Sequence, residues 1–350
     1  MTKKYLYALL ICFSLILATV PKVLSSSSDS CTYHAEAYQG LEINSLVQEL
    51  TSTGLIGRIH GAAGTSQMFV MAVREPNNFF NYREFSLIPS SESTSSTLSQ
   101  LNRHDLVCVQ GNIIANSSPQ KHIALNSVQV LEKWQQPEGF EPYERQTDLP
   151  AELKEQTSLV GKVHAIGAEG KILVMGYQDL VLPIYVTEPE YTKNLYRGDI
   201  VRLNYQVQSY PQRPLHLQLD TTNEQPIEVI DAIASINNQP QTLTGSLVKF
   251  PQSPQLKFDV YAIEVSTDTQ EIKRYFTLIN FEDMAKFQNI RDKLAKIWNE
   301  NANSAVSGRN MLINPEVTIE AIGLGNIISP EQANPQILLE SAEQIKQVTL

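Results

Sequence analysis

The sequence predicts a mainly β protein made of three tandem modules of five strands each. A strand-like segment with a central glycine, residues 54–61, is nearly restated at residues 158–165, and a weaker third copy follows at 242–249. Each copy alternates apolar and polar residues with period two, which is typical of a half-buried strand. A second matched pair, residues 105–109 and 199–203, recurs in the same order. Two ordered matches make chance an unlikely source of the repeat.

The central glycines of these segments are Gly57, Gly161 and Gly245. Glycine inside a strand permits a sharp bend or the close approach of another backbone, and small barrels need both. We therefore expect the three glycines to hold equivalent places in three barrels.

The N-terminus has the pattern of an export signal. Lys3 and Lys4 precede an apolar run at residues 5–20, and a small-residue stretch follows at residues 25–28. We assign residues 1–28 to a signal peptide and predict an exported protein, periplasmic or extracellular. The alternative is a membrane anchor at residues 5–20, although this run is shorter than the about 20 residues that span a bilayer.

Composition limits the function further. The apolar fraction of 42% suffices for packed cores, and the net charge of -10 disfavours a general binder of polyanions. Past the signal only Cys31 and Cys108 remain. They do not form a disulfide framework, but they can pair in an oxidising compartment, and Cys108 lies in the middle of a strand.

We expect module 1 at residues 51–134. A leader at residues 29–50 precedes it; its first part is expected to be exposed to solvent, and residues 42–50 are expected to form a short helix. A linker at 135–150 follows, because this stretch is rich in Pro, Glu and Gln. The five strands are expected at 54–61, 67–73, 82–88, 104–114 and 122–131, with a Ser- and Thr-rich connection at 90–99 after the third.

Module 2 is expected at residues 151–236, before a linker at 237–241. Isoleucine at every third residue from Ile227 to Ile236 predicts a short helix at its end. The strands are expected at 159–165, 171–176, 180–186, 198–205 and 215–219.

Module 3 is expected at residues 242–350 and contains the clearest helix pattern of the chain. Asn280 is a suitable N-cap, and apolar residues from Phe281 to Ile297 recur at helical spacing. The strands are expected at 243–250, 257–265, 273–279, 315–323 and 336–339.

Three strands, a helix or irregular connection, and two further strands recur in each module. This order resembles the OB-fold, a five-stranded Greek-key barrel that binds oligonucleotides or oligosaccharides. The resemblance covers most of the chain after the signal, at the level of the fold and of no particular family. It implies a ligand face on strands one to three and the loops between them.

Four residues on the polar face of the first strands are candidates for ligand binding: Arg58, His60, Lys162 and His164. An Arg or Lys side chain and a His ring on the ligand face can bind a phosphate, a carboxylate or a sugar. We expect these side chains to be exposed on one side of each barrel. The simpler interpretation, which we favour, is that they are solvent-facing residues kept by common ancestry. Module 3 has Ser246 and Val248 instead, which weakens a shared role.

No motif for catalysis, a metal or a cofactor is evident. Gly-x-Ser-x-Gly, His-Glu-x-x-His and a phosphate-binding glycine loop are missing. Cys31, His34 and Glu36 are residues of metal-ligand type, but a second ligand pair at similar spacing is missing, so we expect no zinc site.

The sequence therefore predicts an exported, non-enzymatic binding protein whose partner is a protein or an envelope polysaccharide. The alternative is a single-stranded nucleic-acid-binding protein, in which aromatic residues stack on bases. The acidic charge disfavours this alternative, because no module is basic.

Overall fold

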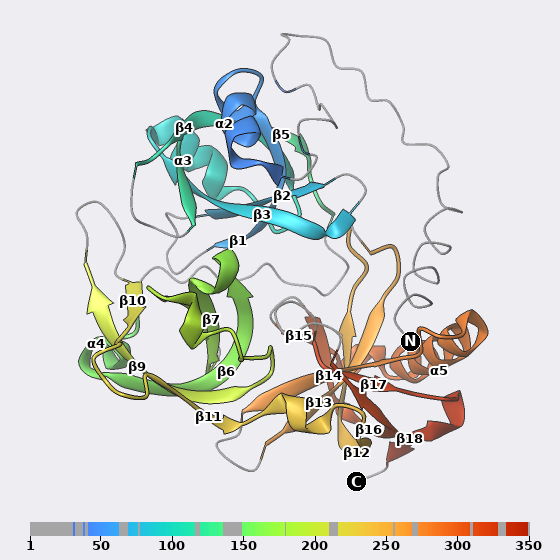
Figure 1. The fold of residues 1–350 in the computed structure, drawn as a ribbon. Helices are drawn as coiled ribbons and strands as arrows, with labels where there is room; N and C mark the ends of the chain where they lie inside the picture. The colour runs from blue at the N-terminus through green and yellow to red at the C-terminus, as the bar shows by residue number, and fades with distance from the viewer. Residues whose placement is uncertain are drawn as a thin grey trace.

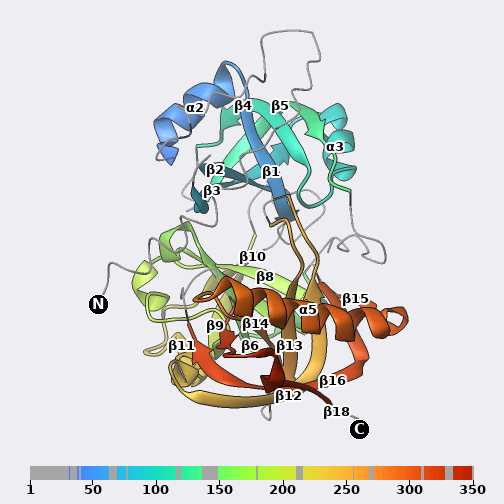
Figure 2. The same cartoon turned by 90° about the vertical axis from the view of Figure 1, so that its right-hand side faces the viewer.

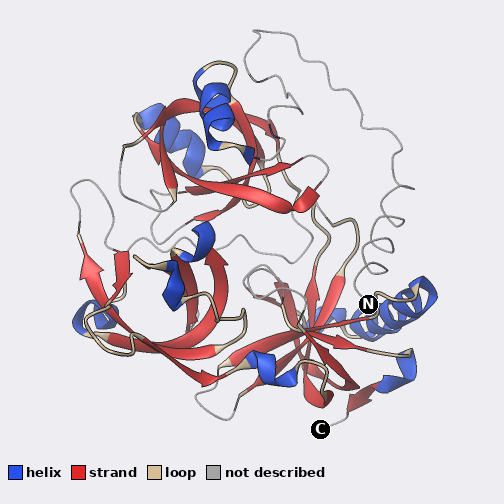
Figure 3. Cartoon of the chain, viewed as in Figure 1, coloured by secondary structure: helices blue, strands red, loops and turns tan. Residues whose placement is uncertain are grey.

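The three strand-rich modules follow one another along the chain, and the prediction of a mainly β protein with tandem OB-like barrels is confirmed (Figures 1 and 3). The structure is a computed structural model. The residues that it describes are 31, 38, 41–62, 69–75, 78–115, 120–135, 149–178, 180–209, 216–254, 256–267, 272–308, 311–327 and 334–348. The predicted signal peptide or anchor and most of the 135–150 linker lie outside these residues.

Module 1 is a closed barrel in which the strands run β1-β2-β3-β5-β4 and β4 pairs back with β1. Its elements are α2 (Ile43–Thr51), β1 (Leu55–Ala62), β2 (Phe69–Glu75), β3 (Asn78–Pro89), α3 (Glu92–Ser99), β4 (Leu106–Ile113) and β5 (Lys121–Glu132). The Ser- and Thr-rich connection is thus a helix, α3, with Ser91 as N-cap in a capping box.

Module 2 repeats this ring as β6-β7-β8-β10-β9, and β9 pairs back with β6. Its elements are α4 (Ala151–Glu155), β6 (Ser158–Gly167), β7 (Ile172–Tyr177), β8 (Leu180–Tyr185), β9 (Ile200–Gln208), β10 (His216–Leu219) and β11 (Ile227–Asp231). The connection between its third and fourth strands holds only the 3-10 turn Pro189–Tyr191.

Module 3 forms the ring β12-β13-β14-β17-β16, with β16 paired back to β12 and two short strands added to β16. Its elements are β12 (Pro240–Phe250), β13 (Val260–Ser266), β14 (Lys273–Ile279), α5 (Met284–Glu300), β15 (Val306–Gly308), β16 (Met311–Asn326), β17 (Gln336–Leu338) and β18 (Ile345–Val348). Helix α5 lies along one side of this module (Figure 2).

One parallel pair recurs in every module, between the third strand and the fifth: β3 with β5, β8 with β10, and β14 with β17. The other pairings of the three rings are antiparallel. This topology is the one that the OB-fold resemblance implied.

Each module has its own hydrophobic core inside the ring. In module 3 the core is completed by α5, whose Ile290, Leu294 and Trp298 are buried against the strands. Among the described residues, no helix is long and apolar enough to cross a membrane.

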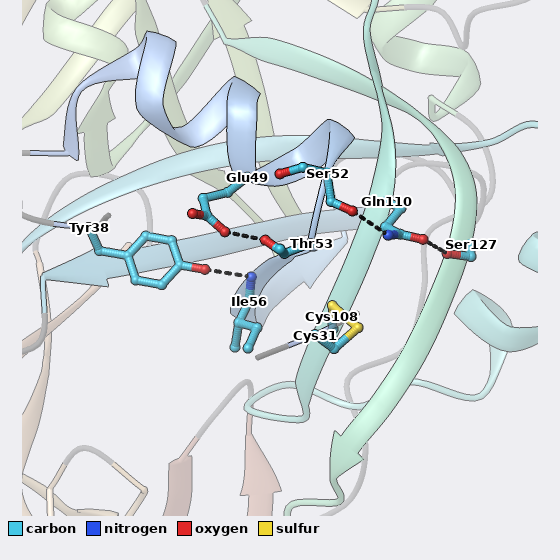
Figure 4. The surroundings of a disulfide bond; sticks show 9 residues. All are labelled: Cys31, Tyr38, Glu49, Ser52, Thr53, Ile56, Cys108, Gln110 and Ser127. Atoms are coloured by element: carbon cyan, nitrogen blue, oxygen red, sulfur yellow. Dashed lines mark hydrogen bonds between the residues drawn. A yellow bond between two sulfur atoms is a disulfide. The ribbon is translucent and has the colours of Figure 1, made fainter. Parts of the chain in front are cut away.

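The described part of the predicted leader is part of module 1. Tyr38, Leu41, Leu46 and Leu50 are all buried in the module 1 core. The backbone N–H of Ile56 on β1 donates to the Tyr38 hydroxyl over 3.1 Å (Figure 4). The expectation of a solvated leader is therefore wrong here, because these apolar side chains cover one side of the barrel.

Two further expectations require correction. The N-cap of α5 is Asp283, whose carboxylate accepts hydrogen bonds from the N–H groups of Ala285 and Lys286. Asn280 is buried instead and donates to the Leu339 carbonyl over 2.7 Å. In consequence the apolar face begins later than expected, and Phe281 is 47% exposed.

The isoleucines of residues 227–236 do not form one helix. The first part is strand β11, paired with β9, and the second is the 3-10 turn Ile233–Ile236. The tertiary context decides this, because the free edge of β9 offers backbone hydrogen bonds that a short isolated helix cannot match.

In each module a buried polar residue pairs through its backbone with the first strand, two residues after the central glycine. The N–H groups of Ile59 and Val163 donate to the carbonyls of Asp105 and Asp199. In module 3 the residue opposite Leu247 is Asn314. The carboxylate of Asp105 also accepts from the N–H groups of Asn102 and Trp134, and that of Asp199 from those of Tyr196 and Ile233, over 2.7–2.8 Å. These bonds satisfy the buried charges and fix the corner of the barrel.

A disulfide joins Cys31 to Cys108 of β4, with their Cα atoms 5.8 Å apart (Figure 4). Cys108 is 1% exposed. Gly54 lies against the bond with φ +100, and a Cβ at this position would lie 2.4 Å from the Cys108 sulfur. Only glycine fits here, since the backbone angle and the sulfur both exclude a side chain.

The first-strand glycines do hold equivalent places. A Cβ on Gly57, Gly161 or Gly245 would lie 2.8, 2.6 or 1.9 Å from a carbonyl oxygen of the second strand of the same barrel. The close approach that the sequence pattern predicted is thus an approach between strands one and two.

We predict that Gly245→Ala destabilises module 3 by about 1–3 kcal/mol, because the new methyl group overpacks against the Glu264 carbonyl. Denaturant unfolding measures the change. Gly61→Ala is the matched control, since no atom lies within 4 Å of a Cβ there. Equal stability of the two variants would contradict the assigned role of Gly245.

We predict that Cys108→Ala lowers the unfolding free energy of module 1 by about 2–4 kcal/mol. Loss of the disulfide opens the loop between Cys31 and Cys108 and so raises the conformational entropy of the unfolded chain. Urea unfolding with and without reductant measures the effect. Reductant should destabilise the wild-type chain alone. If reductant lowered the stability of Cys108→Ala further, the pairing of Cys31 with Cys108 would be contradicted.

Candidate functional site

Arg58 and His60 lie on the outer face of β1, and both are held by their own module. Arg58 donates to the His104 carbonyl over 2.8 Å and forms an ion pair of 3.2 Å with Glu132. His60 pairs with Glu84 through Nδ1 and contacts the Tyr82 ring edge-on at 5.9 Å between centroids. Both side chains are half-buried, so they differ from the exposed pair that we expected.

Lys162 holds the equivalent place on β6 but faces module 3. Its ammonium donates to the Lys273 carbonyl and lies 4.4 Å from the centroid of the Tyr275 ring. His164 is half-buried on the same strand. Arg58 and His60 thus contact residues of module 1, whereas Lys162 contacts module 3. A ligand-binding role for the four stays a prediction.

The contact between modules 2 and 3 centres on Arg274 of β14, whose side chain is 9% exposed. Its guanidinium donates to the Gly198 carbonyl over 2.9 Å, to the Asp231 carbonyl over 2.8 Å and to the Asp231 carboxylate over 2.7 Å. Three charge-assisted bonds from one side chain fix the two modules in one orientation.

Modules 1 and 2 also meet through the outer faces of their strands. The Glu84 carboxylate of β3 lies 4.0 Å from the place that a Cβ on Gly167 would take. Arg197, which precedes β9, is close enough to Arg103 and Tyr82 of module 1 for its pKa to respond to their charges. We call the region where the three barrels face one another the junction (Figure 1). Its members are Tyr82, Glu84 and Arg103 of module 1, Lys162, Arg197 and Gly198 of module 2, and Lys273, Arg274 and Tyr275 of module 3.

Burial at the junction disfavours positive charge. It lowers the pKa of Lys162 to about 7, and the nearby cations Arg197, Arg274 and Lys273 act in the same direction. It lowers the pKa of Arg197 to about 10, with a further contribution from Arg103.

His104 lies beside this region, and its pKa is lowered to about 3 by burial and by nearby cations, Arg103 first. The ring contacts Trp134 edge-on at 5.9 Å between centroids. His104 is therefore a neutral, structural histidine near neutral pH.

The aromatic residues near the first strands divide between core and surface. Phe85 is buried in the module 1 core, and Tyr205 is buried in module 2 with its hydroxyl donating to the Leu153 carbonyl over 2.9 Å. Tyr82 instead lies under the Arg74 guanidinium, 4.6 Å from it. Sequence reasoning could not separate these roles, since each residue lies in a strand.

Sequence reasoning also missed Arg274, Asp231 and Arg197. The only signal was the alternation of residues 273–277, which places Arg274 and Tyr275 on opposite sides of a strand. Within the described part of the chain, no three His, Cys, Asp or Glu residues are grouped to hold a metal ion. His34 and Glu36 lie outside that part.

Neither a scan of protein-family models nor a search of curated proteins finds a match. Solved structures do match parts of the chain. A murine DNA-binding protein bound with double-stranded DNA is 14% identical over 51% of this chain and 95% of its own, with a TM-score of 0.20. The tetrameric p202 HIN2 is 12% identical over 50% and 92%, with a TM-score of 0.19.

An aspartyl tRNA synthetase from Entamoeba histolytica is 17% identical over 35% of this chain and 29% of its own, with a TM-score of 0.22. At such TM-scores the likeness carries no information on function or on the arrangement of the modules. The OB-like assignment rests on the strand pairing of this chain itself.

We predict that Arg274→Ala destabilises the contact of modules 2 and 3 by about 2 kcal/mol or more, because Asp231 and the Gly198 carbonyl lose their donors. Limited proteolysis between the modules and urea unfolding both measure it. Arg202→Ala is the control, since Arg202 and Glu228 form an ion pair that is about half exposed, and a change below about 0.5 kcal/mol is expected. Equal effects of the two variants would contradict the role of Arg274.

Proposed function

We propose that this is an exported, non-enzymatic binding protein whose three barrels act as one platform for a protein partner or an envelope polysaccharide. The observation that carries the proposal is the mutual engagement of the modules. Lys162 and Arg274 tie module 2 to module 3. A chain whose barrels are fixed to each other presents one composite surface rather than three separate modules.

Export is supported by two independent features. The disulfide of Cys31 and Cys108 belongs to an oxidising compartment, since cytosolic proteins seldom keep structural disulfides. The N-terminal sequence has the order of a signal peptide, with Lys3 and Lys4 before the apolar run 5–20.

The class of partner follows from charge. The chain carries a net charge of -10. A net charge of this sign repels polyanions over about a Debye length. A neutral polysaccharide or a protein with a basic surface fits this charge better.

Two buried groups with shifted pKa values have structural contacts, which supports a non-enzymatic role. Lys162 donates to the Lys273 carbonyl, and Asp199 accepts from the N–H groups of Tyr196 and Ile233. Burial raises the pKa of Asp199, and the two backbone hydrogen bonds oppose this shift.

Single-stranded nucleic acid is the second candidate. The pairs Arg74 with Tyr82 and Lys162 with Tyr275 favour it, since single-strand binders combine cations with aromatic platforms. The position of these pairs at or beside the junction disfavours it, because bases need access to the rings.

Export is tested by expressing the full chain in its native host and sequencing the N-terminus of the mature protein. A mature end near residues 25–28 and protection of the chain from protease until the envelope is opened are expected. Recovery of a protein that begins at Met1 from the cytosolic fraction would contradict the proposal of export.

Binding is tested with the exported chain against immobilised envelope polysaccharide and against a labelled single-stranded oligonucleotide at two salt concentrations. Polysaccharide binding with little dependence on salt, together with weak oligonucleotide binding, is expected. Tight oligonucleotide binding that falls steeply with salt, and that Tyr82→Ala reduces, would favour the second candidate over the first.

A further inference from the structure

Helix α5 carries apolar and aromatic side chains that the core of module 3 leaves partly exposed. Phe281, shortly before the helix, is 47% exposed, and Met284 in its first turn is 58% exposed. Phe287 and Arg291 follow at helical spacing and are half-buried, so they lie on the same face as Met284. Helix α5 lies on the viewer's side of module 3 in Figure 2. We call these four residues, together with Phe258 from the loop between β12 and β13, the α5 surface.

Arg291 lies against two rings of this surface. Its guanidinium carbon is 5.6 Å from the ring centroid of Phe258 and 5.8 Å from that of Phe287, and the two rings meet edge-on at 5.5 Å. These contacts restrict the conformations of the side chain. Within the residues that the structure describes, no carboxylate or carbonyl accepts a hydrogen bond from Arg291. A positioned guanidinium therefore still has its donors available for a ligand.

The carboxylates close to Arg291 already have other partners. Burial raises the pKa of Tyr261 to about 12, the charge of Asp259 adds to this shift and the charge of Arg291 opposes it, so both charges act on the Tyr261 hydroxyl. Asp259 forms an ion pair of 3.8 Å with Lys249. Asp292, the next residue of the helix, accepts a hydrogen bond of 2.7 Å from a glutamine side chain one turn earlier.

The other carboxylates at the start of α5 lie around Lys286. The hydrogen bond to Glu340 raises the pKa of Lys286. The charges of Asp283 and Glu282 act in the same direction. Lys286 comes two positions after Met284, about 200° around the helix axis, so it faces another side of α5. The α5 surface is therefore locally positive, although the chain as a whole is acidic.

We propose that the α5 surface binds a protein partner through a segment in which an aspartate or glutamate lies next to large apolar side chains. The carboxylate pairs with Arg291, and the apolar side chains cover Phe281 and Met284. The proposal rests on the proposed function, because it selects a protein as the partner, and it specifies one segment of that partner rather than its net charge.

The composition of the surface favours a protein over a polysaccharide. Aromatic residues, methionine and arginine are the types enriched where proteins meet. Met284 is flexible and adapts to irregular apolar side chains. The rings of Phe258 and Phe287 meet edge-on and share one guanidinium, so they do not form an open, flat platform for a sugar ring.

The test measures binding of the full mature chain to labelled peptides by fluorescence anisotropy. In the probe peptide, flanked by serine and glycine, aspartate lies between leucine and phenylalanine; in the matched peptide asparagine replaces aspartate. The wild type should bind the acidic peptide at least about tenfold more tightly than the amide peptide. Arg291→Met keeps an apolar side chain but removes the charge, so this difference should fall to about twofold or less.

Lys296→Met is the matched control, since Lys296 is a cation of the same helix, outside the α5 surface and 76% exposed. It should bind both peptides as the wild type does. Met284→Ser should weaken both peptides by a similar factor, because it removes an apolar contact alone. The exposure of Met284 keeps this variant folded, and urea unfolding checks the fold of each variant.

Equal binding of the two peptides by the wild type, no binding of either, or a preference that Arg291→Met retains would overturn the proposal. Immobilised envelope polysaccharide, tested with the same variants, separates this result from the proposed function. Arg291→Met should bind it as the wild type does. A wild type that binds the polysaccharide but neither peptide would refute the α5 surface as a protein site and leave the platform intact. Loss of polysaccharide binding in Arg291→Met would assign the surface to a polysaccharide and overturn the proposal.

Discussion

Each barrel depends on one constraint: its first strand must pair along both edges, with the second strand on one side and the fourth on the other. The pairing with the second strand brings a carbonyl oxygen so close to the first strand that only Gly57, Gly161 or Gly245 fits there. The pairing with the fourth strand continues two residues later, where the N–H of Ile59 donates to the backbone carbonyl of the buried Asp105. The repeated sequence pattern is therefore the record of this double pairing.

The same constraint determines what the outer faces present. A strand that turns Ile59 or Val163 into the core turns Arg58 and Lys162 outward. In an isolated barrel such residues would face water. Here Arg58 contacts the His104 carbonyl and Glu132 of its own module, whereas Lys162 is part of the junction, where burial lowers its pKa. The same strand pattern thus serves a contact within module 1 and a contact between modules 2 and 3.

The three barrels differ in the elements that close them. Module 1 is closed by its N-terminal segment, with Tyr38 in the core and Cys31 bound to Cys108. Module 3 is closed by α5, which buries Trp298. Module 2 has only a 3-10 turn at the corresponding connection and relies on the contacts of Arg274 with Asp231. We infer that its orientation is the most dependent on its neighbours.

The sequence alone determined the strand order, the three modules and the equivalent glycines, because period-two alternation and a central glycine are local patterns that each strand carries by itself. The sequence also indicated the helix of module 3, but it placed the N-cap at Asn280. It could not show that the Asn280 side chain donates to the Leu339 carbonyl instead. Only the tertiary structure decided that Lys162 faces Tyr275, that Arg274 joins two modules and that the segment around Tyr38 is buried. These contacts join residues far apart in the chain, and a solvent-facing lysine and an interface lysine have the same strand pattern.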